Sequence, residues 1–536
     1  MNSKWFGVGA ALSVLALLGA GTAPASSTPR HGLPLGPADL TETRTTRTLQ
    51  PGVTLTRIVR GAEAPALAWT VEMAIPGGAT SPDPDAPPAA LKDRASAAEL
   101  AAGLRADGFD ARAEEVRTPP VADFPGGSLG WRVRVGRYPA QAGANAERAR
   151  LIAAGYTGSA TYTGWDGDAT DRGPWRIDVL TIDPRTFRGA LKASYGPDLE
   201  RRETTSALAA AAGASAGVNA GFFVLDPKAG APGDPAGVGV YDGRLLSEAV
   251  DGRPGLVVRD SARGTRVERF TWRGSVTGAG RTLALDGVDR VPGLIRNCGG
   301  TADDTPTSLP LHDVTCTDPD EVVAFTPEFG ARTPQGEGVE AVLDRHGRVL
   351  DVRSPRGVTL PEGGSSVQAT GKEAARLTAL AESGRRLRVD SGLRDGEGRP
   401  VATRGTSILN GGPELVRDGR LHTTPAADGM VQPGNPSFSY GWVHKRNPRT
   451  LAGVDDRGRT VLVTADGRGT DALGLSIPES AAVAQALGLR DAVNLDGGGS
   501  TTMVADGRVI NDPSDATGER PVGDALLITP GRDRPM

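Results

Sequence analysis

One segment near the C-terminus limits the possible folds most strongly. It reads Asp491-Ala-Val-Asn-Leu-Asp-Gly-Gly-Gly-Ser-Thr-Thr-Met503, an apolar strand that ends in an Asn, an Asp and three consecutive glycines. Glycine runs lose backbone entropy and side-chain contacts, so they occur where the backbone needs a positive φ or passes close to a ligand. The segment therefore predicts either a polar site at the end of a buried strand or a tight structural turn.

Further segments share this design, in which a short apolar run ends in polar residues or glycine. They are Asn219-Ala-Gly221-Phe222-Phe223, Arg449-Thr-Leu-Ala-Gly453 and Asp466-Gly-Arg468. The last two flank a pattern that predicts a strand, a hairpin turn and a second strand. Polar groups are thus expected at several strand ends.

In this order, these motifs resemble those of the phosphodiester glycosidase family. The similarity covers about residues 174–530 and includes Arg508-Val-Ile-Asn511 and Glu519-Arg520-Pro-Val-Gly-Asp524. The resemblance implies a strand-rich α+β catalytic domain. It also implies hydrolysis of the bond between a sugar anomeric carbon and a phosphodiester, as in GlcNAc-1-phosphate linkages of envelope or extracellular glycans.

Such chemistry needs a carboxylate as nucleophile or as the base that activates water. Asp496 and Asp466 are the candidate catalytic pair because both are predicted at strand ends. Either could instead be a Ca²⁺ ligand, since carboxylates, Asn oxygens and turn carbonyls suit a hard cation. A purely structural turn is the third interpretation of the glycine segment.

Other residues are expected to bind the substrate. Arg449 suits the phosphate because its guanidinium can contact two oxygens, unless it is a surface residue paired with Asp455 or Asp456. The glycine amides are expected to form an anion-binding nest, and the asparagines to orient sugar hydroxyls. Phe222 and Phe223 are either core residues or a stacking platform. The expected substrate-binding set is Asn219, Gly221, Phe222, Arg449, Arg468, Asn494, Gly497, Gly498, Gly499 and Ser500.

Composition limits the function classes. A chain of 536 residues predicts two or more domains. The net charge of −4 provides no basic surplus for binding nucleic acid. The five histidines show no zinc-ligand spacing, so no metal is assigned.

The N-terminus predicts export. Residues 1–25 contain one lysine, an apolar run and Ala23-Pro24-Ala25, the layout of a cleavable signal peptide. A secreted or extracellular protein follows, with the cell wall as one location and no membrane span after signal removal. Residues 26–50 are rich in Pro, Thr and Ser and are predicted to be a disordered leader.

Residues 51–165 are predicted to form a separate α+β domain. A strand–helix–strand pattern occurs twice, with the first helix expected to begin at an N-cap Ser96 that Glu99 completes as a capping box. Together with Trp131-Arg-Val-Arg-Val-Gly-Arg-Tyr138, the repeat resembles a SPOR (sporulation-related) domain. That resemblance implies binding to peptidoglycan glycan strands; the alternative is a plain packing domain.

Two interpretations remain for the whole chain, a secreted glycosidase and a non-catalytic glycan-binding protein of the cell envelope. The two cysteines, Cys298 and Cys316, predict one disulfide in an oxidising compartment, with two buried thiols as the alternative. Such a bridge would contribute roughly 3 kcal/mol in the chain-entropy model.

Overall fold

The computed structural model describes residues 32–75, 89–250, 252–298, 311–381 and 385–531. The predicted signal peptide and the first residues of the predicted leader lie outside these ranges. Within them, no helix is both long enough and apolar enough to cross a membrane.

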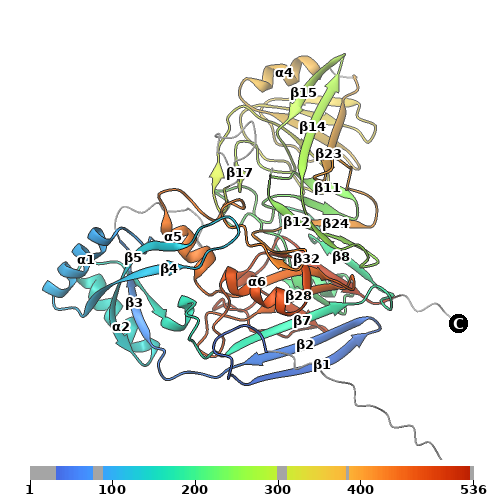
Figure 1. The fold of residues 1–536 in the computed structure, drawn as a ribbon. Coiled ribbons are helices and arrows are strands. Elements are labelled where there is room, and N and C mark those ends of the chain that lie inside the picture. The colour runs from blue at the N-terminus through green and yellow to red at the C-terminus, as the bar shows by residue number, and fades with distance from the viewer. Residues whose placement is uncertain (1–31, 76–88, 251, 299–310, 382–384, 532–536) are drawn as a thin grey trace, which may run out of the picture. The chain divides into compact units, whose positions relative to one another are not determined.

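The C-terminal part is built on an eight-stranded antiparallel sheet (Figure 1). Its strands, in spatial order, are β1 Glu42–Gln50, β2 Val53–Arg60, β7 Trp175–Ile182, β28 Thr460–Ala465, β27 Arg449–Asp455, β29 Leu489–Asn494, β25 Glu414–Arg417 and β26 Arg420–Leu421. Side chains alternate between the two faces. Ile177 and Val463 share a core with helix α6 (Ile477–Ala486), whereas Leu180 and Leu462 belong to a second core on the opposite face.

Two expectations for the N-terminal part are wrong. The predicted disordered leader contains β1, which pairs with β2 from Glu42 to Gln50. Strand β2, assigned to the N-terminal domain, pairs along its whole length with β7 of the large sheet. The sequence of β1 shows no apolar alternation because this edge strand is mostly exposed. In β2, Val53, Leu55 and Ile58 are buried: the first two belong to the second core and Ile58 to the first, on the two faces of the large sheet.

A five-stranded sheet faces the large one across the second core. Its strands, in spatial order, are β31 Arg508–Val509, β30 Met503–Ala505, β9 Ala216–Asn219, β32 Ala525–Thr529 and β8 Ala190–Ser194. Val218 and Ile528 contribute to this core, and helix α3 (Thr205–Ala211) packs on the outer face through Leu208. Strand β9 thus brings its last residue, Asn219, next to the glycine segment.

The remaining strands between β9 and β25 form four further sheets. The first consists of β11 Arg244–Ser247, β10 Gly239–Tyr241, β24 Thr406–Asn410, β12 Pro254–Arg259 and β13 Arg266–Arg269. The second consists of β15 Arg281–Leu285, β14 Thr271–Gly278 and β23 Arg388–Arg394. The third consists of β16 Gly287–Val288, β19 Val322–Phe325, β22 Ser365–Ala369, β20 Val339–Leu343 and β21 Val349–Arg353. Helix α4 (Glu373–Leu380) packs against the third, and β17 Ile295–Arg296 pairs with β18 Thr315–Cys316.

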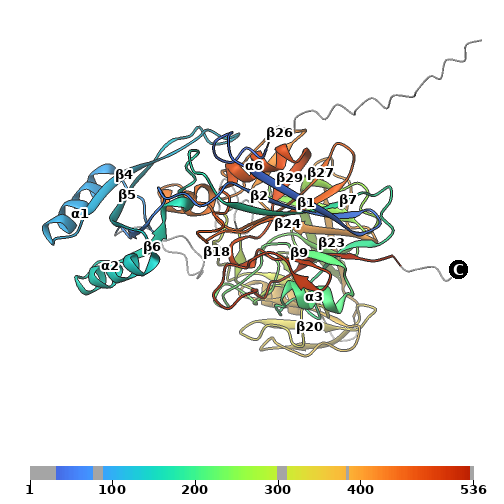
Figure 2. The same cartoon turned by 90° about the horizontal axis from the view of Figure 1, so that it is seen from below.

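The N-terminal domain confirms the predicted double strand–helix–strand pattern. Its antiparallel sheet has the order β4 Ala111–Thr118, β5 Gly127–Tyr138, β3 Trp69–Met73, β6 Gly158–Tyr162. Helices α1 (Arg94–Ala106) and α2 (Gln141–Ala153) pack against one face (Figure 2). The predicted N-cap is wrong: Asp93 caps α1, because its carboxylate accepts from the backbone N–H of Ser96 at 3.0 Å.

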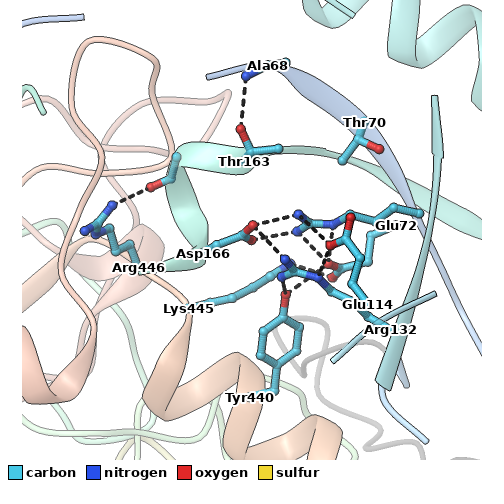
Figure 3. A network of polar contacts seen from close by, with 12 residues as sticks. Ala68, Thr70, Glu72, Glu114, Arg132, Thr163, Asp166, Tyr440, Lys445 and Arg446 are labelled. Atoms are coloured by element: carbon cyan, nitrogen blue, oxygen red, sulfur yellow. Dashed lines mark hydrogen bonds and ion pairs between the residues drawn. The ribbon is translucent and has the colours of Figure 1, made fainter. Parts of the chain in front are cut away.

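The helix-free face of this sheet is buried against residues 436–446, which form helix α5 (Pro436–Ser439) and the π-helical turn Tyr440–His444 (Figure 3). The Glu72 carboxylate accepts from Arg134 at 2.9 Å, from Lys445 Nζ at 2.6 Å and from the Tyr440 hydroxyl at 3.0 Å. Asp166 accepts from Arg134 as well. Charged groups of both parts therefore neutralise one another inside the protein.

Candidate active site

The glycine segment forms a turn that begins directly after β29. Its middle is a 3₁₀ turn, Gly498–Ser500, and Gly498 has a φ of 60°, where glycine is favoured. A side chain on Gly499 would clash with the ion pair between Arg520 and Asp515. Gly498 is therefore explained by its positive φ, and Gly499 by the close approach of the C-terminal loop to the turn.

Asn219 and Asn494 position this turn. Asn219 is fully buried; its Nδ2 donates to the Asp496 carbonyl at 2.7 Å, and its Oδ1 accepts from the Thr450 hydroxyl at 2.7 Å. The Nδ2 of Asn494 donates to the carbonyls of Gly412 and Leu495. The amide group of Asn219 is committed inside the protein, which gives it a supporting place instead of the expected contact with sugar. Asn494 supports the turn through its Nδ2, whereas its buried Oδ1 has no partner among the described residues.

A cavity of about 50 Å³ opens at the turn. Three residues of the predicted set reach it, namely Asp496, Ser500 and Phe222. The cavity also contains residues that the sequence analysis did not select, among them Arg296, His312, Trp442 and Arg520. Segments from five distant parts of the chain therefore meet at Asp496.

Three buried hydrogen-bond donors of this cavity have no partner among the described residues. They are the Oγ of Ser500, the Nε1 of Trp442 and the Nε2 of His312. The Nδ1 of His312 lies 3.1 Å from the Nη2 of Arg253, and because arginine can only donate, we assign the imidazole proton to Nε2. Buried donors without a partner are costly, so they mark a place where a ligand supplies the acceptors.

The cavity offers both cationic and neutral hydrogen-bond donors. Burial, together with the nearby Arg253 and Arg296, holds the pKa of His312 well below its usual range, so the imidazole is neutral. Arg296 and Arg520 add two guanidinium groups to the lining, each paired with a carboxylate, Asp313 and Asp515 respectively. A phosphate oxygen would find both cations and neutral donors here.

Arg449 is neither at the cavity as a phosphate ligand nor at the surface in an ion pair, the two places that the sequence suggests. It is 3% exposed, and it donates to the backbone carbonyls of Leu475 at 2.9 Å and Trp442 at 2.8 Å. Burial lowers its pKa to about 9. Pairing with Asp455 is wrong, because Asp455 pairs with Arg459. Arg449 instead fixes the backbone of the turn that carries Trp442.

The structure does not bring Asp466 into the cavity lining found among the described residues. Its Oδ1 accepts from the Nδ2 of Asn511 at 3.1 Å and from the backbone N–H of Asp512 at 3.0 Å. Burial raises its pKa to about 6. Asp466 thus ties the loop after β31 to the end of β28, and Asp496 alone of the predicted pair faces the cavity.

The remaining predicted residues lie around the turn. Two amides of the expected anion nest are already used: Gly497 N–H donates to the Asp496 carboxylate and Gly498 N–H to the Pro448 carbonyl, both at 2.9 Å. Gly221 N–H donates to the Asp524 carboxylate at 2.7 Å. Arg468 donates to the Asn447 side chain at 3.3 Å. The expected nest is therefore wrong for these two glycines.

The alternative of a Ca²⁺ site finds no support in the donor set. Within the described ranges, no three His, Cys, Asp or Glu side chains converge to hold a metal ion. The carboxylate of Asp496 shares its cavity with the guanidinium groups of Arg296 and Arg520, whose positive charges oppose a cation.

The predicted disulfide between Cys298 and Cys316 is confirmed. It joins the two segments that carry Arg296 and His312 into the cavity lining. Asn297, next to the bridge, donates to the Ala236 carbonyl at 3.0 Å and accepts from the Asp313 N–H at 2.7 Å. The bridge therefore supports one wall of the site.

Sequence reasoning missed four cavity residues for different reasons. Arg520 lies in the quoted Glu519-Arg520 motif, so that signal was present. Arg296, His312 and Trp442 lie outside the four motifs, and the spacing of the histidines carries no signal for this site. Their proximity to Asp496 depends on the fold.

Comparisons with known proteins identify two domain families in this chain. The phosphodiester glycosidase family matches residues 337–529, and the SPOR domain family matches residues 89–162. The bovine N-acetylglucosamine-1-phosphodiester alpha-N-acetylglucosaminidase is 27% identical over 206 residues, which is 35% of this chain and 38% of that protein. The mouse enzyme of the same name is 35% identical over 112 residues, 21% of its length. The matches thus span well under half of these relatives.

Solved structures extend the likeness to nearly the whole chain. A protein of Burkholderia pseudomallei K96243 that carries the provisional name of an exported protein is 35% identical, with a TM-score of 0.83 over 94% of this chain and 99% of that one. A hypothetical protein from Synechocystis, 14% identical with a TM-score of 0.52 over 91% of this chain and 76% of that one, shares the fold. The chain therefore contains a phosphodiester glycosidase-family domain and, ahead of it, a SPOR domain.

Proposed function

We propose that this protein is a secreted glycosidase that hydrolyses the bond between a sugar anomeric carbon and a phosphodiester. The observation that carries the proposal is the cavity at Asp496, where this carboxylate and that of Asp313 meet two guanidinium groups. Three buried donors of the cavity have no partner among the described residues. The substrate class is a GlcNAc-1-phosphodiester of an envelope or extracellular glycan. The names of the bovine and mouse relatives support this class.

The groups of the cavity divide the reaction between them. Arg296 and Arg520 hold the phosphate and stabilise it as it leaves as an anion. The hydroxyl of Ser500 and the N–H groups of Trp442 and His312 donate to phosphate or sugar oxygens. Asp496 acts on the anomeric carbon as nucleophile, or as the base that deprotonates water. Because phosphate is a good leaving group, the site needs little help from a general acid.

The SPOR domain supports the cell wall as the working location, with peptidoglycan as its partner. Residues 436–446 cover the helix-free face of its sheet, so a glycan strand would have to contact other surfaces of the domain. Retention of the full-length protein on amidase-treated sacculi tests this part of the proposal. Release of all protein in the wash would remove peptidoglycan as a partner.

The catalytic part is tested with Asp496→Asn and a GlcNAc-1-phosphomethyl diester. The amide oxygen can still accept from Gly497 N–H, so the fold should remain. Turnover should fall at least about 10³-fold, because a reacting carboxylate is lost. Asp456→Asn, in the exposed turn between β27 and β28, is the matched control and should keep parental activity.

Two results would contradict the assignment. Near-parental turnover of Asp496→Asn would remove this carboxylate from the reaction. Tight binding of the diester by the parent protein without any hydrolysis would favour the non-catalytic glycan-binding alternative.

A further inference from the structure

A second, larger cavity of about 410 Å³ lies beside the candidate active site. Asp234, Pro235 and Gly237 line it, whereas Ala236 of the same segment lines the smaller cavity. Arg296 lines both. One stretch of chain and one arginine thus separate the two spaces. The larger volume falls within the ~300–1,000 Å³ typical of small-molecule sites.

Asp234 is the unusual group of this cavity. It is 3% exposed, and neither of its carboxylate oxygens has a hydrogen-bond partner among the described residues. Burial raises its pKa well above the usual range, and the neighbouring Asp289 and Glu248 raise it further. Native proteins rarely bury a carboxyl group without partners, so its missing partner is expected to come from a ligand.

Arg290 is the cation that acts electrostatically on Asp234, but it is paired with other carboxylates. The guanidinium of Arg290 donates to Glu248 at 2.6 Å and to Glu321 at 2.5 and 2.9 Å. Another N–H of the same guanidinium group donates to the Asp286 carbonyl. The ionisable groups in the lining are Asp234, Glu248, Asp286, Glu321, Arg273, Arg290 and Arg296. Because Arg290 is already paired with two carboxylates, the Asp234 carboxyl group lies among other acidic groups and no hydrogen bond from Arg290 reaches it.

Part of the lining suits the body of a sugar ring. Trp272, Leu285 and Ile295 provide apolar surface beside Ser247, between the ionisable groups named above. Small-molecule sites combine such apolar walls with a small number of placed polar groups. A ligand for this cavity should therefore have apolar faces and one group that can pair with Asp234.

We infer that this cavity binds a saccharide residue that carries a free ammonium group, with Asp234 as its counter-ion. The choice of a saccharide rests on the proposed function, because the shared Arg296 places this residue beside the sugar-phosphate pocket. The choice of an ammonium group rests on Asp234 and its surroundings. The cavity thus selects substrates in which an amino sugar neighbours the phosphodiester.

Isothermal titration calorimetry of the full-length protein tests this inference. The probes are the disaccharide of glucosamine, which has free amino groups, and its N,N′-diacetylated form. The free amine should bind at least about tenfold more tightly, as expected for one charge-assisted hydrogen bond. Asp234→Asn should remove this preference. Asp390→Asn, a half-exposed aspartate on β23, should retain it.

A second measurement needs no variant. Burial raises the pKa of Asp234 and an arriving ammonium group lowers it, so binding should release protons into the buffer. The binding enthalpy should then change with the ionisation enthalpy of the buffer. Equal affinity for the two disaccharides, or a preference that survives in Asp234→Asn, would overturn the inference.

Hydrolysis assays on the same preparation separate the two proposals. A protein that hydrolyses the GlcNAc-1-phosphomethyl diester but shows no preference for the free amine contradicts only the second site. A protein that prefers the free amine without hydrolysing any diester supports the second site and contradicts the glycosidase proposal.

Discussion

At the scale of single residues, hydrogen-bond partners distinguish supporting side chains from those that face a ligand. Asn219 uses its amide group on the Asp496 carbonyl, Thr450 and the Thr502 N–H, so it fixes the turn from behind. Ser500 is equally buried but its hydroxyl has no partner within the described ranges. The residue type alone would have favoured asparagine as the sugar ligand, whereas its partners give it a supporting role.

Ser500→Ala is expected to separate activity from stability. Because the hydroxyl has no protein partner, its removal should leave the melting temperature nearly unchanged. The loss of one donor to substrate should lower kcat/KM roughly 10- to 100-fold. Thr450→Val provides the opposite case, since that hydroxyl donates to Asn219 and its loss should lower the melting temperature. A parental kcat/KM in Ser500→Ala would place the substrate elsewhere.

The titration of Asp466 should make the free energy of unfolding depend on pH. Its pKa is about 6 in the folded protein, against 3.8 as the ordinary value, so the folded state keeps a proton that the unfolded chain has lost between these values. Stability from this group is therefore lost as pH rises from about 4 to 6, and remains lost above.

Asp466→Asn keeps an oxygen acceptor for Asp512 N–H but does not titrate. The variant should gain stability relative to the parent at pH 7, on the order of 1–3 kcal/mol, with the difference fading at pH 4. Urea unfolding at both pH values measures it. If Asp466 instead belongs to the catalytic pair, this variant will lose turnover at every pH.

At the scale of elements, two short segments build the cavity wall opposite Asp496. The π-helical turn Tyr440–His444 carries Trp442, and partners on both sides hold it: Arg449 on the Trp442 carbonyl and Thr118 on the His444 ring at 3.0 Å. The β17–β18 pair carries Arg296, and the disulfide closes this second segment. Neither element has an apolar pattern of its own, so both depend on these contacts.

Reduction of the Cys298–Cys316 bridge should weaken the second segment. Closing a loop of this length is worth roughly 3 kcal/mol in the chain-entropy model, so reductant should lower the melting temperature by several degrees. KM for the diester should rise as well, because Arg296 is displaced. The Cys298→Ser, Cys316→Ser double variant should behave like the reduced protein without reductant. Unchanged KM in both would exclude a role of the bridge in substrate binding.

At the scale of the whole molecule, the SPOR domain packs into the phosphodiester glycosidase-family part of the chain. Burial raises the pKa of Glu72, but Lys445, Arg134 and Arg132 outweigh it and hold that pKa below the usual range. Apolar contacts run beside this network, since Trp69 and Leu473 belong to the same core cluster. A domain attached only as a tether would not bury charged groups in this way.

Glu72→Gln is expected to affect both parts of the protein. It leaves Arg134 and Lys445 without their shared counter-charge, which should cost about 3–5 kcal/mol. Differential scanning calorimetry should show one transition for the parent and a separate, earlier transition of the SPOR domain in the variant. Activity should fall too, because Tyr440 and Lys445 flank Trp442. Glu115→Gln, on the same sheet but exposed, is the control.

The sequence by itself determined the elements whose signals are local. The four family motifs and the double strand–helix–strand repeat depend on neighbours a few residues apart. The same holds for the glycine turn, where a positive φ at Gly498 requires glycine.

Only the tertiary structure decided which polar groups face a ligand. His312 lies 184 positions before Asp496 in the chain, and both line the same cavity, but nothing in the local sequence links them. Likewise, the exposed Thr and Arg pattern of β1 gives no sign of its pairing with β2, and Asp466 looks as catalytic as Asp496 until its partners are known. The physical reason is that burial and hydrogen-bond satisfaction depend on segments far apart in the chain, and these determine whether a polar side chain supports the fold or binds substrate.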